Sequence, residues 1–391
     1  MTHRPDDTTI SHVMETLIAN GLEGMAEAVA VLMNEAMKLE RSKFLKAAPY
    51  ERTENRRGNG NGFKDKTIRT RLGELGLRIP QVRDVADGEA FYPQALERGL
   101  RSERALALAV AEMYVNGVST RRVKEITREL CGLNVSSTDV SRATALLDEQ
   151  LEGWRTRALD SVPYLVLDAR YEKVRHGGQV VSCAVLVATG VLADGRRSVL
   201  GVSVALSEAE VHWRSFLSSL TERGLCGVRL VVSDDHEGLK KALNSVLPSV
   251  PRQRCQFHLQ QNAGHYVPRV SMRKEVAAAI KAVFNAPDRP EADRLLGKLC
   301  ERYRDTAPRL ATWAERNIPE GLTVLSMPQS HRRRLRTTNS LERLNKEIKR
   351  RTRVATLFPN EASLLRLVTA IVSEVSEDWE ASRIYLNMEA E

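Results

Sequence analysis

The stretch from residue 163 to residue 247 most constrains the fold of this 391-residue chain. It contains four apolar runs rich in β-branched residues, the composition of buried strands. These runs span residues 164–167, 180–188, 198–205 and 228–232. An Ala-Asp-Gly hairpin signal at 193–195 joins the second run to the third, and amphipathic helices are expected at 208–220 and 237–247. Three strands, a helix, a strand and a helix predict a mixed α/β sheet.

The rest of the chain has mainly helical spacing of its apolar residues. The expected elements are two helices within 10–50, a basic Gly/Asn-rich loop at 51–66, a short hairpin within 67–80, helices within 101–154, a helical insertion at about 271–318, and helices at 340–351 and 361–382. Ser119 and Ser136 are expected N-caps, and Arg121 and Arg122 lie at the start of one of these short helices. This pattern resembles a helix-turn-helix, with ordinary helical packing as the equally supported alternative.

Composition limits the class of protein. The chain is 42% hydrophobic and 28% charged, has no run of about 18 apolar residues, and begins without the apolar core of a secretory signal. We therefore expect no membrane association. Five scattered cysteines fit a reducing cytoplasm rather than a disulfide scaffold. Aromatic residues make up only 5% of the chain, which disfavours a single-strand reader built on base stacking.

Excess positive charge is concentrated in residues 331–353. This segment has eight Arg and two Lys against two Glu, a balance of +8, whereas the whole chain carries +9. Such a segment is suited to neutralising the phosphates of nucleic acid. Its candidate DNA contacts are Arg332, Arg333, Arg334, Arg336, Asn339, Arg343, Asn345, Lys346, Lys349, Arg350, Arg351 and Arg353.

Two aspartates follow apolar strands of the expected sheet. Asp168 comes after the first run and Asp234 after the last. If the two strands are neighbours, both carboxylates project into one crevice at the rim of the sheet. Their mutual repulsion would favour a bound cation such as Mg²⁺. Each could instead be a turn residue, and Asp235 is an alternative to Asp234.

Glu342 is an acid within the basic segment. One interpretation is structural: Asn339 and Glu342 have the spacing of a capping box, and Lys346 lies four residues further on, at ion-pair spacing. Ion pairing alone would not need the surplus arginines, which phosphate neutralisation does need.

Three motifs point to a known family. The longest is HRRRLRTTNSLERLNKEIKRRTRVATLFPN at 331–360, and the others are QRCQFH at 253–258 and VVSD at 231–234. With these motifs the chain resembles the mutator-type insertion-sequence transposases, bacterial DDE enzymes with an RNase H-like core. The resemblance covers nearly the whole chain.

The resemblance implies a DDE triad of Asp168, Asp234 and Glu342, which would hold Mg²⁺ with Mn²⁺ as an expected substitute. Water and then a 3′-hydroxyl would attack phosphodiesters at the ends of a mobile element. The implied partners are double-stranded DNA, both terminal inverted repeats and target DNA, and a second copy of the chain in a homodimer or higher oligomer. A cytoplasmic, nucleoid-associated location follows.

The implied fold is an RNase H-like mixed-sheet core with an α-helical insertion, preceded by a mostly helical DNA-binding region. We expect an N-terminal region at 1–100 that contacts DNA or another subunit, a helix-turn-helix-like domain at 101–157, and a catalytic domain at 158–391. Supporting residues are expected to be Cys255, His258, His236 and Trp213. Structural zinc needs four ligands, and no second Cys/His pair lies at finger spacing, so Cys255 and His258 are expected to be structural or to contact substrate.

Two other functions fit the residues. A structure-selective nuclease could use the same acids, and strand transfer by a 3′-hydroxyl would distinguish it from a transposase. A non-catalytic DNA-binding regulator would tolerate Asp168→Ala, and the complete set of acids argues against it.

Overall fold

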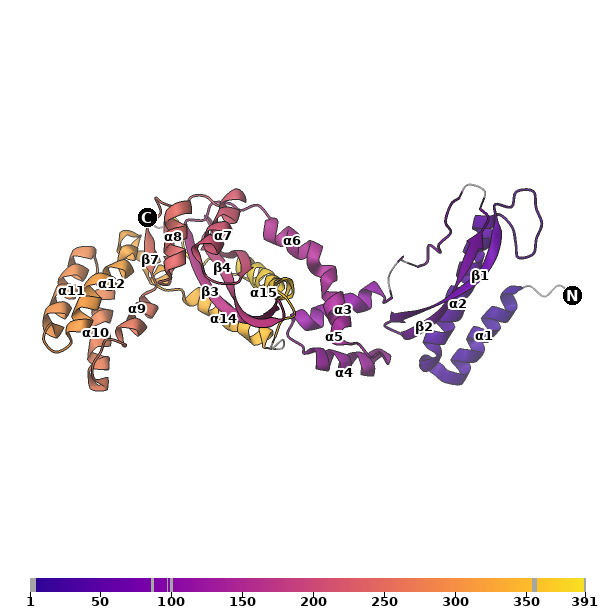
Figure 1. Cartoon of the computed structure of the whole chain (residues 1–391), viewed down its shortest axis with the longest axis horizontal. Helices are drawn as coiled ribbons and strands as arrows, with labels where there is room; N and C mark the ends of the chain where they lie inside the picture. Colours follow the sequence, from indigo (N-terminus) through magenta and orange to yellow (C-terminus); the bar gives the residue numbers. More distant parts are fainter. Residues whose placement is uncertain (1–4, 86–87, 97, 99–100, 354–356, 390–391) are drawn as a thin grey trace. The chain divides into compact units, whose positions relative to one another are not determined.

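The computed structural model describes residues 5–85, 88–96, 98, 101–353 and 357–389. The chain forms two compact units (Figure 1). The first comprises Met1–Tyr114 and Val118–Leu147, and the second comprises Val115–Gly117 and Asp148–Glu391.

The first unit begins with helices packed on a β-hairpin. Its elements are α1 (Pro5–Asn20), η1 (Gly21–Gly24), α2 (Met25–Leu45), β1 (Asn59–Thr70) and β2 (Gly73–Arg83). Leu75, Leu77 and Ile79 alternate along β2 and face one core with Ala30 and Met37 of α2. The two predicted helices and the hairpin are confirmed. The hairpin is longer than expected, because pairing with β2 draws the Gly/Asn-rich residues from Asn59 onward into β1.

One helical segment of this unit, Thr8–Leu45, is long and apolar enough by composition to be a candidate membrane span. The sequence had not led us to expect one. By length and composition alone this indication is weak; the segment lies near the N-terminus, 17% of its apolar window is buried, and α2 contributes to the core beside β2.

Three short helices complete the first unit: α3 (Arg104–Val115), α4 (Thr120–Cys131) and α5 (Ser137–Thr144), followed by η2 (Ala145–Leu147). Both predicted caps are confirmed. The Ser119 side chain accepts a hydrogen bond from the Arg122 backbone N–H, and Ser136 forms a reciprocal capping box with Asp139. These caps decide where α4 and α5 begin.

The second unit is built on the predicted mixed sheet. Its strands are β3 (Tyr164–His176), β4 (Gln179–Val191), β5 (Arg197–Ala205), β6 (Leu230–Ser233) and β7 (Arg252–Arg254), in the order β5-β4-β3-β6-β7. β4 is antiparallel to both of its neighbours, β3 and β5, and β6 and β7 run parallel to β3. Asp168 therefore lies within β3 and not at its end, because pairing with β4 continues as far as His176.

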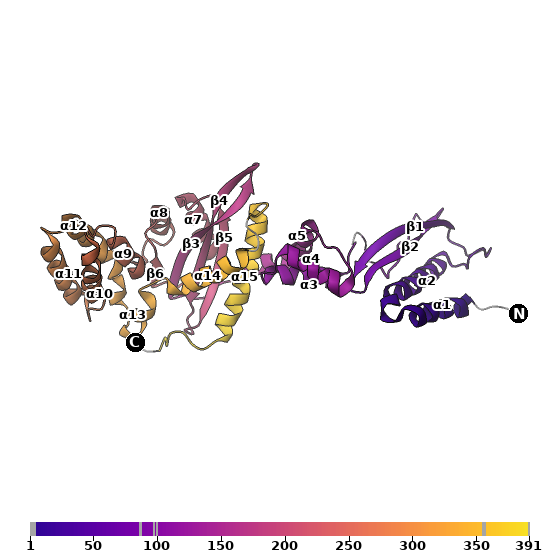
Figure 2. The same ribbon diagram turned by 90° about the horizontal axis from the view of Figure 1, so that it is seen from below.

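Helices cover both faces of this sheet (Figure 2). On one face lie α7 (Glu210–Glu222) and α8 (Glu237–Val246), and α14 (Asn339–Thr352) and α15 (Glu361–Ala381) lie on the other. Trp213 and Leu217 of α7 pack on Leu165 and Leu167 of β3. On the opposite side, the Ser376 hydroxyl of α15 accepts a hydrogen bond from the Val199 N–H at 2.9 Å. The helix α6 (Asp148–Thr156) leads into the sheet.

A helical insertion follows β7, as predicted. It contains α9 (Gln256–Ala263), η3 (Val270–Met272), α10 (Arg273–Phe284), α11 (Arg289–Tyr303), α12 (Pro308–Asn317), η4 (Ile318–Gly321), η5 (Thr323–Ser326) and α13 (Gln329–Leu335). It has its own apolar core, which includes Ile280, Leu310 and Ala314. The helical region is longer at both ends than the expected 271–318, because α9 and α13 extend it.

Candidate active site

The structure brings the first two predicted acids together. Val166 of β3 pairs with Val232 of the parallel neighbour β6. Asp168 and Asp234 each follow two residues later, so the strand register brings both to the same level of the sheet. The condition set by the sequence, that the two strands be neighbours, is met.

Asp168 lies in a poorly solvated, acidic environment. Its pKa is raised from 3.8 to about 6, first by burial and then by the charges of Asp234 and Glu208, while the Ala169 backbone and His258 oppose the rise. Its Oδ2 accepts a hydrogen bond from Nδ2 of Asn345, on α14, at 2.8 Å. Asn345, a predicted DNA contact, thus orients an acid of the site.

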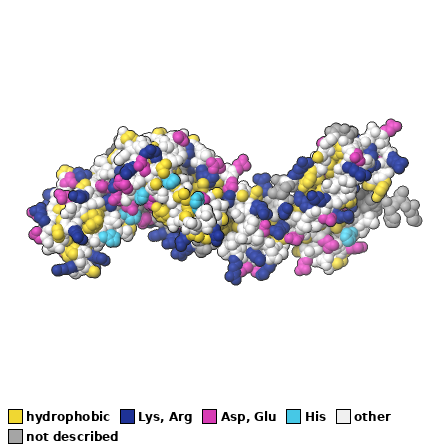
Figure 3. Space-filling view, viewed as in Figure 1, with side chains coloured by type: hydrophobic (Ala, Val, Ile, Leu, Met, Phe, Trp, Pro, Cys, Tyr) yellow, Lys and Arg dark blue, Asp and Glu magenta, His cyan; other side chains and the backbone are white. Residues whose placement is uncertain are grey.

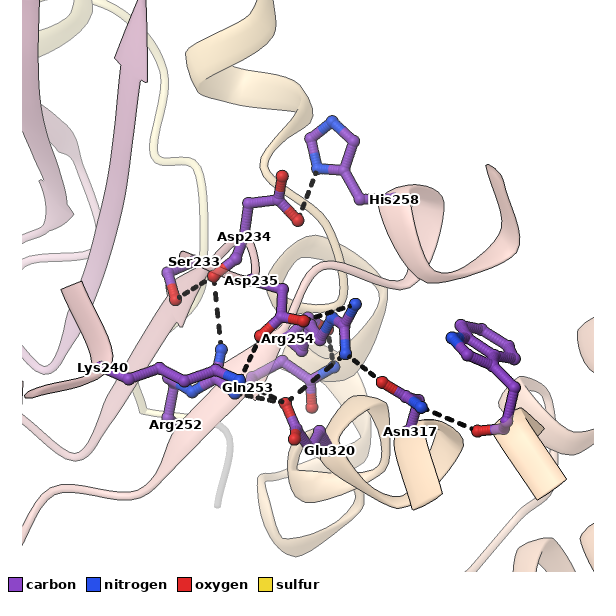
Figure 4. A network of polar contacts seen from close by, with 11 residues as sticks. Ser233, Asp234, Asp235, Lys240, Arg252, Gln253, Arg254, His258, Asn317 and Glu320 are labelled. Atoms are coloured by element: carbon purple, nitrogen blue, oxygen red, sulfur yellow. Dashed lines mark hydrogen bonds and ion pairs between the residues drawn. The ribbon is translucent and has the colours of Figure 1, made fainter. Parts of the chain in front are cut away.

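Asp234 and its neighbour Asp235 have separate roles. Asp235 is ion-paired with Lys240 and with Arg254, whose Nη2 lies 2.8 Å from Asp235 Oδ2 (Figure 4). Burial alone would raise the pKa of Asp235, but the hydrogen bond from Lys240 and the charge of Arg254 hold it below its usual value. Asp234 points the other way, toward His258, with 3.6 Å between Oδ1 and Nδ1. Asp235 is therefore committed to ion pairs, and Asp234 is the acid available to the site.

Glu342 lies on the same helix as Asn345, three residues earlier and so on the same face. The structural interpretation does not hold: α14 has Thr338 as its N-cap, and no side chain caps it. Glu342 Oε1 is buried without a hydrogen-bond partner, and within the described ranges Glu342 forms no ion pair with Lys346.

The carboxylates of Asp168, Asp234 and Glu342 are oxygen ligands of the kind that a hard divalent cation binds. Oδ1 of Asp234 and Oε1 of Glu342 are both buried oxygens without hydrogen-bond partners, and carboxylate oxygens are the ligands that Mg²⁺ prefers. Within the described part of the chain, however, no three His, Cys, Asp or Glu side chains are grouped closely enough to hold a metal ion. Asp168 and Asp234 lie on adjacent strands, and Glu342 lies on α14, three residues before the Asn345 that binds Asp168.

The Cys-x-x-His motif lies against these acids. The pKa of His258 is raised to about 9, first by its hydrogen bond with Cys255 and then by the charges of Asp234 and Asp168, against the opposing effect of burial. Burial alone would raise the pKa of the Cys255 thiol, but hydrogen bonds from His258 and Thr338 lower it. At neutral pH His258 is therefore a cation facing two carboxylates.

The other supporting residues differ in position. Trp213 is fully buried in the core under the sheet. His236 begins α8 and faces Glu208 across 3.8 Å, and both line a cleft of about 440 Å³. Sequence reasoning did not assign Glu208, Thr338 or Arg254 to the site. No local pattern marks Thr338 or Arg254, because their roles arise from contacts with distant segments.

Some cations of the basic segment are exposed, and others are bound to protein groups. Lys and Arg side chains gather along the edge of the second unit where α14 lies (Figure 3). The exposed cations that have no partner among the described residues are Arg333, Arg343, Lys346, Lys349 and Arg353. Arg351 does not fit a DNA contact, because it is 6% exposed and bound to Glu347 and Glu374.

The remaining predicted DNA contacts have protein partners. Arg332 donates to the Met327 and Pro287 carbonyls, Arg336 to Asn285, and Arg350 to Glu347, and Arg334 stacks on the Tyr385 ring. Asn339 is exposed at the first residue of α14. In the first unit, Arg121 and Arg122 both lie near Glu125 on α4.

Comparisons with known proteins agree with one another. Residues 2–382 match the family model described as "Transposase, Mutator family". The chain is 56% identical over 389 residues to a transposase for insertion sequence element IS406 of Burkholderia multivorans, covering 99% of each chain. It is 36% identical over 366 residues to a transposase for insertion sequence element IS256 in transposon Tn4001 of Staphylococcus aureus, covering 92% of each.

Among solved structures, a simian T-cell lymphotropic virus intasome in complex with a PP2A regulatory subunit matches 58% of this chain and 72% of that chain. The identity is 13% and the TM-score 0.18, too low to support an inference about the fold. The family model and the relatives, which span almost the whole chain, show that this protein belongs to the Mutator family of transposases.

Proposed function

We propose that this protein is a DDE transposase of a bacterial insertion sequence, with an RNase H-like catalytic core in its second unit. It binds terminal inverted repeats, cleaves DNA and transfers the strands to a target. The observation that carries the proposal is the pair of buried carboxylate oxygens without hydrogen-bond partners on Asp234 and Glu342, with Asp168 on the strand adjacent to β6. Buried polar atoms in native proteins are normally paired, so such atoms indicate a missing ligand.

Asp168, Asp234 and Glu342 would hold Mg²⁺, with Mn²⁺ as a substitute. Bound there, such ions would activate the attacking oxygen and stabilise the leaving one. The protein side chains do the rest: Asn345 orients Asp168 through its 2.8 Å hydrogen bond. His258, protonated at neutral pH, offsets part of the negative charge of Asp168 and Asp234.

The exposed cations of the basic segment would bind the DNA backbone. Lys346 and Lys349 follow Glu342 by four and seven residues, on its own face of α14, and both are exposed, as is Arg343. Phosphates bound there would lie next to the acids, and each contact would release condensed counterions. The first unit, through Arg121 and Arg122 among others, would recognise the terminal repeat. Joining two ends requires a homodimer or higher oligomer on DNA, in the cytoplasm at the nucleoid.

The test is Mg²⁺-dependent cleavage of a supercoiled plasmid that carries both ends of the element. Asp234→Asn removes one charge with little change of shape, and Glu237→Gln is the matched control, an exposed acid three residues away. We expect the wild type and Glu237→Gln to cut at the ends, and Asp234→Asn to bind the ends without cutting. Equal cleavage by Asp234→Asn would refute the triad assignment. Binding without cleavage by the wild type would favour a non-catalytic regulator, and cleavage of pre-cut ends without strand transfer would favour a nuclease.

A further inference from the structure

Cys255 holds the start of α14 through its sulfur. The residue is fully buried. Its Sγ accepts two hydrogen bonds from Thr338, one from the backbone N–H and one from the hydroxyl, each at 3.4 Å. Thr338 precedes α14, and its hydroxyl does not cap the helix because it is directed at the sulfur. The contact with Cys255 thus fixes the N-cap residue of α14.

The same residue holds the end of β6 through its backbone. The Cys255 N–H donates to the Ser233 carbonyl at 2.9 Å, directly before Asp234. The next residue, Gln256, donates its N–H to the Arg336 carbonyl at 2.9 Å, two residues before Thr338. Cys255 is therefore a junction between the strand end that presents Asp234 and the helix start that leads to Glu342.

The connection continues into the first turn of α14. The Glu342 N–H donates to the Thr338 carbonyl at 3.0 Å, so any shift of Thr338 moves Glu342 with it. A continuous series of hydrogen bonds runs from Ser233 through Cys255 and Thr338 to Glu342. These residues are far apart in sequence, and the two acids have no covalent connection shorter than the whole insertion.

The neighbours of Cys255 are immobilised, so the junction is a rigid one. Arg254, with 3% of its side chain exposed, binds Asp235 and also Asn317 at 2.8 Å (Figure 4). The side-chain amides of Gln253 and Gln256 both donate to the Gly321 carbonyl at 2.8 Å. The segment on either side of Cys255 is thus held against the insertion and cannot adjust easily to a change at the sulfur.

We propose that Cys255 is a positioning residue that sets the placement of Glu342 relative to Asp234 through its contact with Thr338. This inference rests on the proposed function, because it matters only if the two acids act together. Displacements of about 1 Å in such a constellation reduce rates by up to about a hundredfold.

The test uses the full-length protein with Cys255→Ala, Cys255→Ser and Thr338→Val. Cys183→Ala is the matched control, because Cys183 is also fully buried but lies in β4, away from Thr338. We would measure single-turnover cleavage of element ends, binding of those ends, and the rise in melting temperature on adding Mg²⁺. The last readout does not depend on activity.

We expect Cys255→Ala and Thr338→Val each to reduce cleavage at least about tenfold, with end binding unchanged and a smaller Mg²⁺-induced rise in melting temperature. Cys255→Ser should retain more of the cleavage rate and of the Mg²⁺-induced rise in melting temperature than Cys255→Ala, since a hydroxyl oxygen also accepts hydrogen bonds. The double variant should be no worse than the more impaired single variant, because both remove one contact.

Wild-type cleavage by Cys255→Ala, multiplicative losses in the double variant, or an equal loss in Cys183→Ala would each overturn the inference and leave the triad standing. If Cys255→Ala fails to fold, Thr338→Val and Cys255→Ser carry the same comparison. A wild type that neither cleaves nor gains stability from Mg²⁺ would refute the proposed function itself, and the role of Cys255 with it.

Discussion

Replacing Asp168 by Asn is expected to stabilise the metal-free protein while abolishing cleavage. The carboxyl of Asp168 is held in a site that disfavours its charged form, as shown by a pKa raised from 3.8 to about 6. Burial is the largest cause, followed among the unfavourable contributions by the charges of Asp234 and Glu208. Asparagine has a similar shape and no charge, so it avoids this penalty. Active sites commonly sacrifice stability in this way.

The magnitude and sign follow from proton linkage. Below about pH 3.8 the carboxyl is protonated in both the folded and the unfolded chain, and no difference arises. Between that pH and about 6 the unfolded chain releases its proton while the folded one keeps it, so stability falls as pH rises. Each pKa unit corresponds to about 1.4 kcal/mol, so at pH 7 the penalty in the wild type reaches about 3 kcal/mol.

The assay is urea unfolding of the wild type and Asp168→Asn in EDTA across pH 4 to 8. We expect the difference in free energy of unfolding to grow by about 2.4 kcal/mol between pH 4 and pH 7 and then to level off. A difference that does not change with pH, or a variant less stable than the wild type at pH 7, would refute the reasoning. It would mean that Asp168 is not held in an unfavourable environment.

Three further predictions concern the same region. Mg²⁺ should stabilise the wild type against unfolding, by about 2.7 kcal/mol at a hundred times its dissociation constant, and calorimetry should show a smaller gain for Asp234→Asn. Asp235→Asn should destabilise the protein by about 2 kcal/mol, because it removes the nearest carboxylate of the buried Arg254, at 2.8 Å, and leaves only Asn317 and the more distant Glu320, at 3.8 Å. An unfolding midpoint equal to that of the wild type would contradict this. Lys349→Ala should reduce the slope of log affinity for DNA against log salt by about 0.9 with no change in melting temperature, whereas Arg351→Ala should lower the melting temperature because it removes a buried ion pair with Glu374.

Local patterns in the sequence were sufficient for much of the fold. Alternation of Leu75, Leu77 and Ile79 predicted a strand with one buried face, and Ser119 and Ser136 predicted two helix starts. These features depend on neighbours within a few residues, so they can be read without knowing the rest of the chain. The apolar runs that precede Asp168 and Asp234 predicted strands in the same way, and the acids were candidates because of where those runs end.

The position and role of the site acids depend on residues distant in the sequence, so only the tertiary structure shows them. Pairing with β4 extends β3 past Asp168, and the parallel register with β6 brings Asp168 level with Asp234. Ion pairs with Arg254 and Lys240 commit Asp235, which the sequence could not distinguish from its neighbour.

The same holds for side chains whose roles are set by burial. Arg351 looked like a DNA contact among other arginines, yet it is buried against Glu374. The contact of Cys255 with Thr338 joins segments that are 83 residues apart. Charge and periodicity can be read from a short stretch of the chain. Burial and hydrogen bonding also depend on the distant segments that pack against that stretch, and only the tertiary structure shows which segments these are.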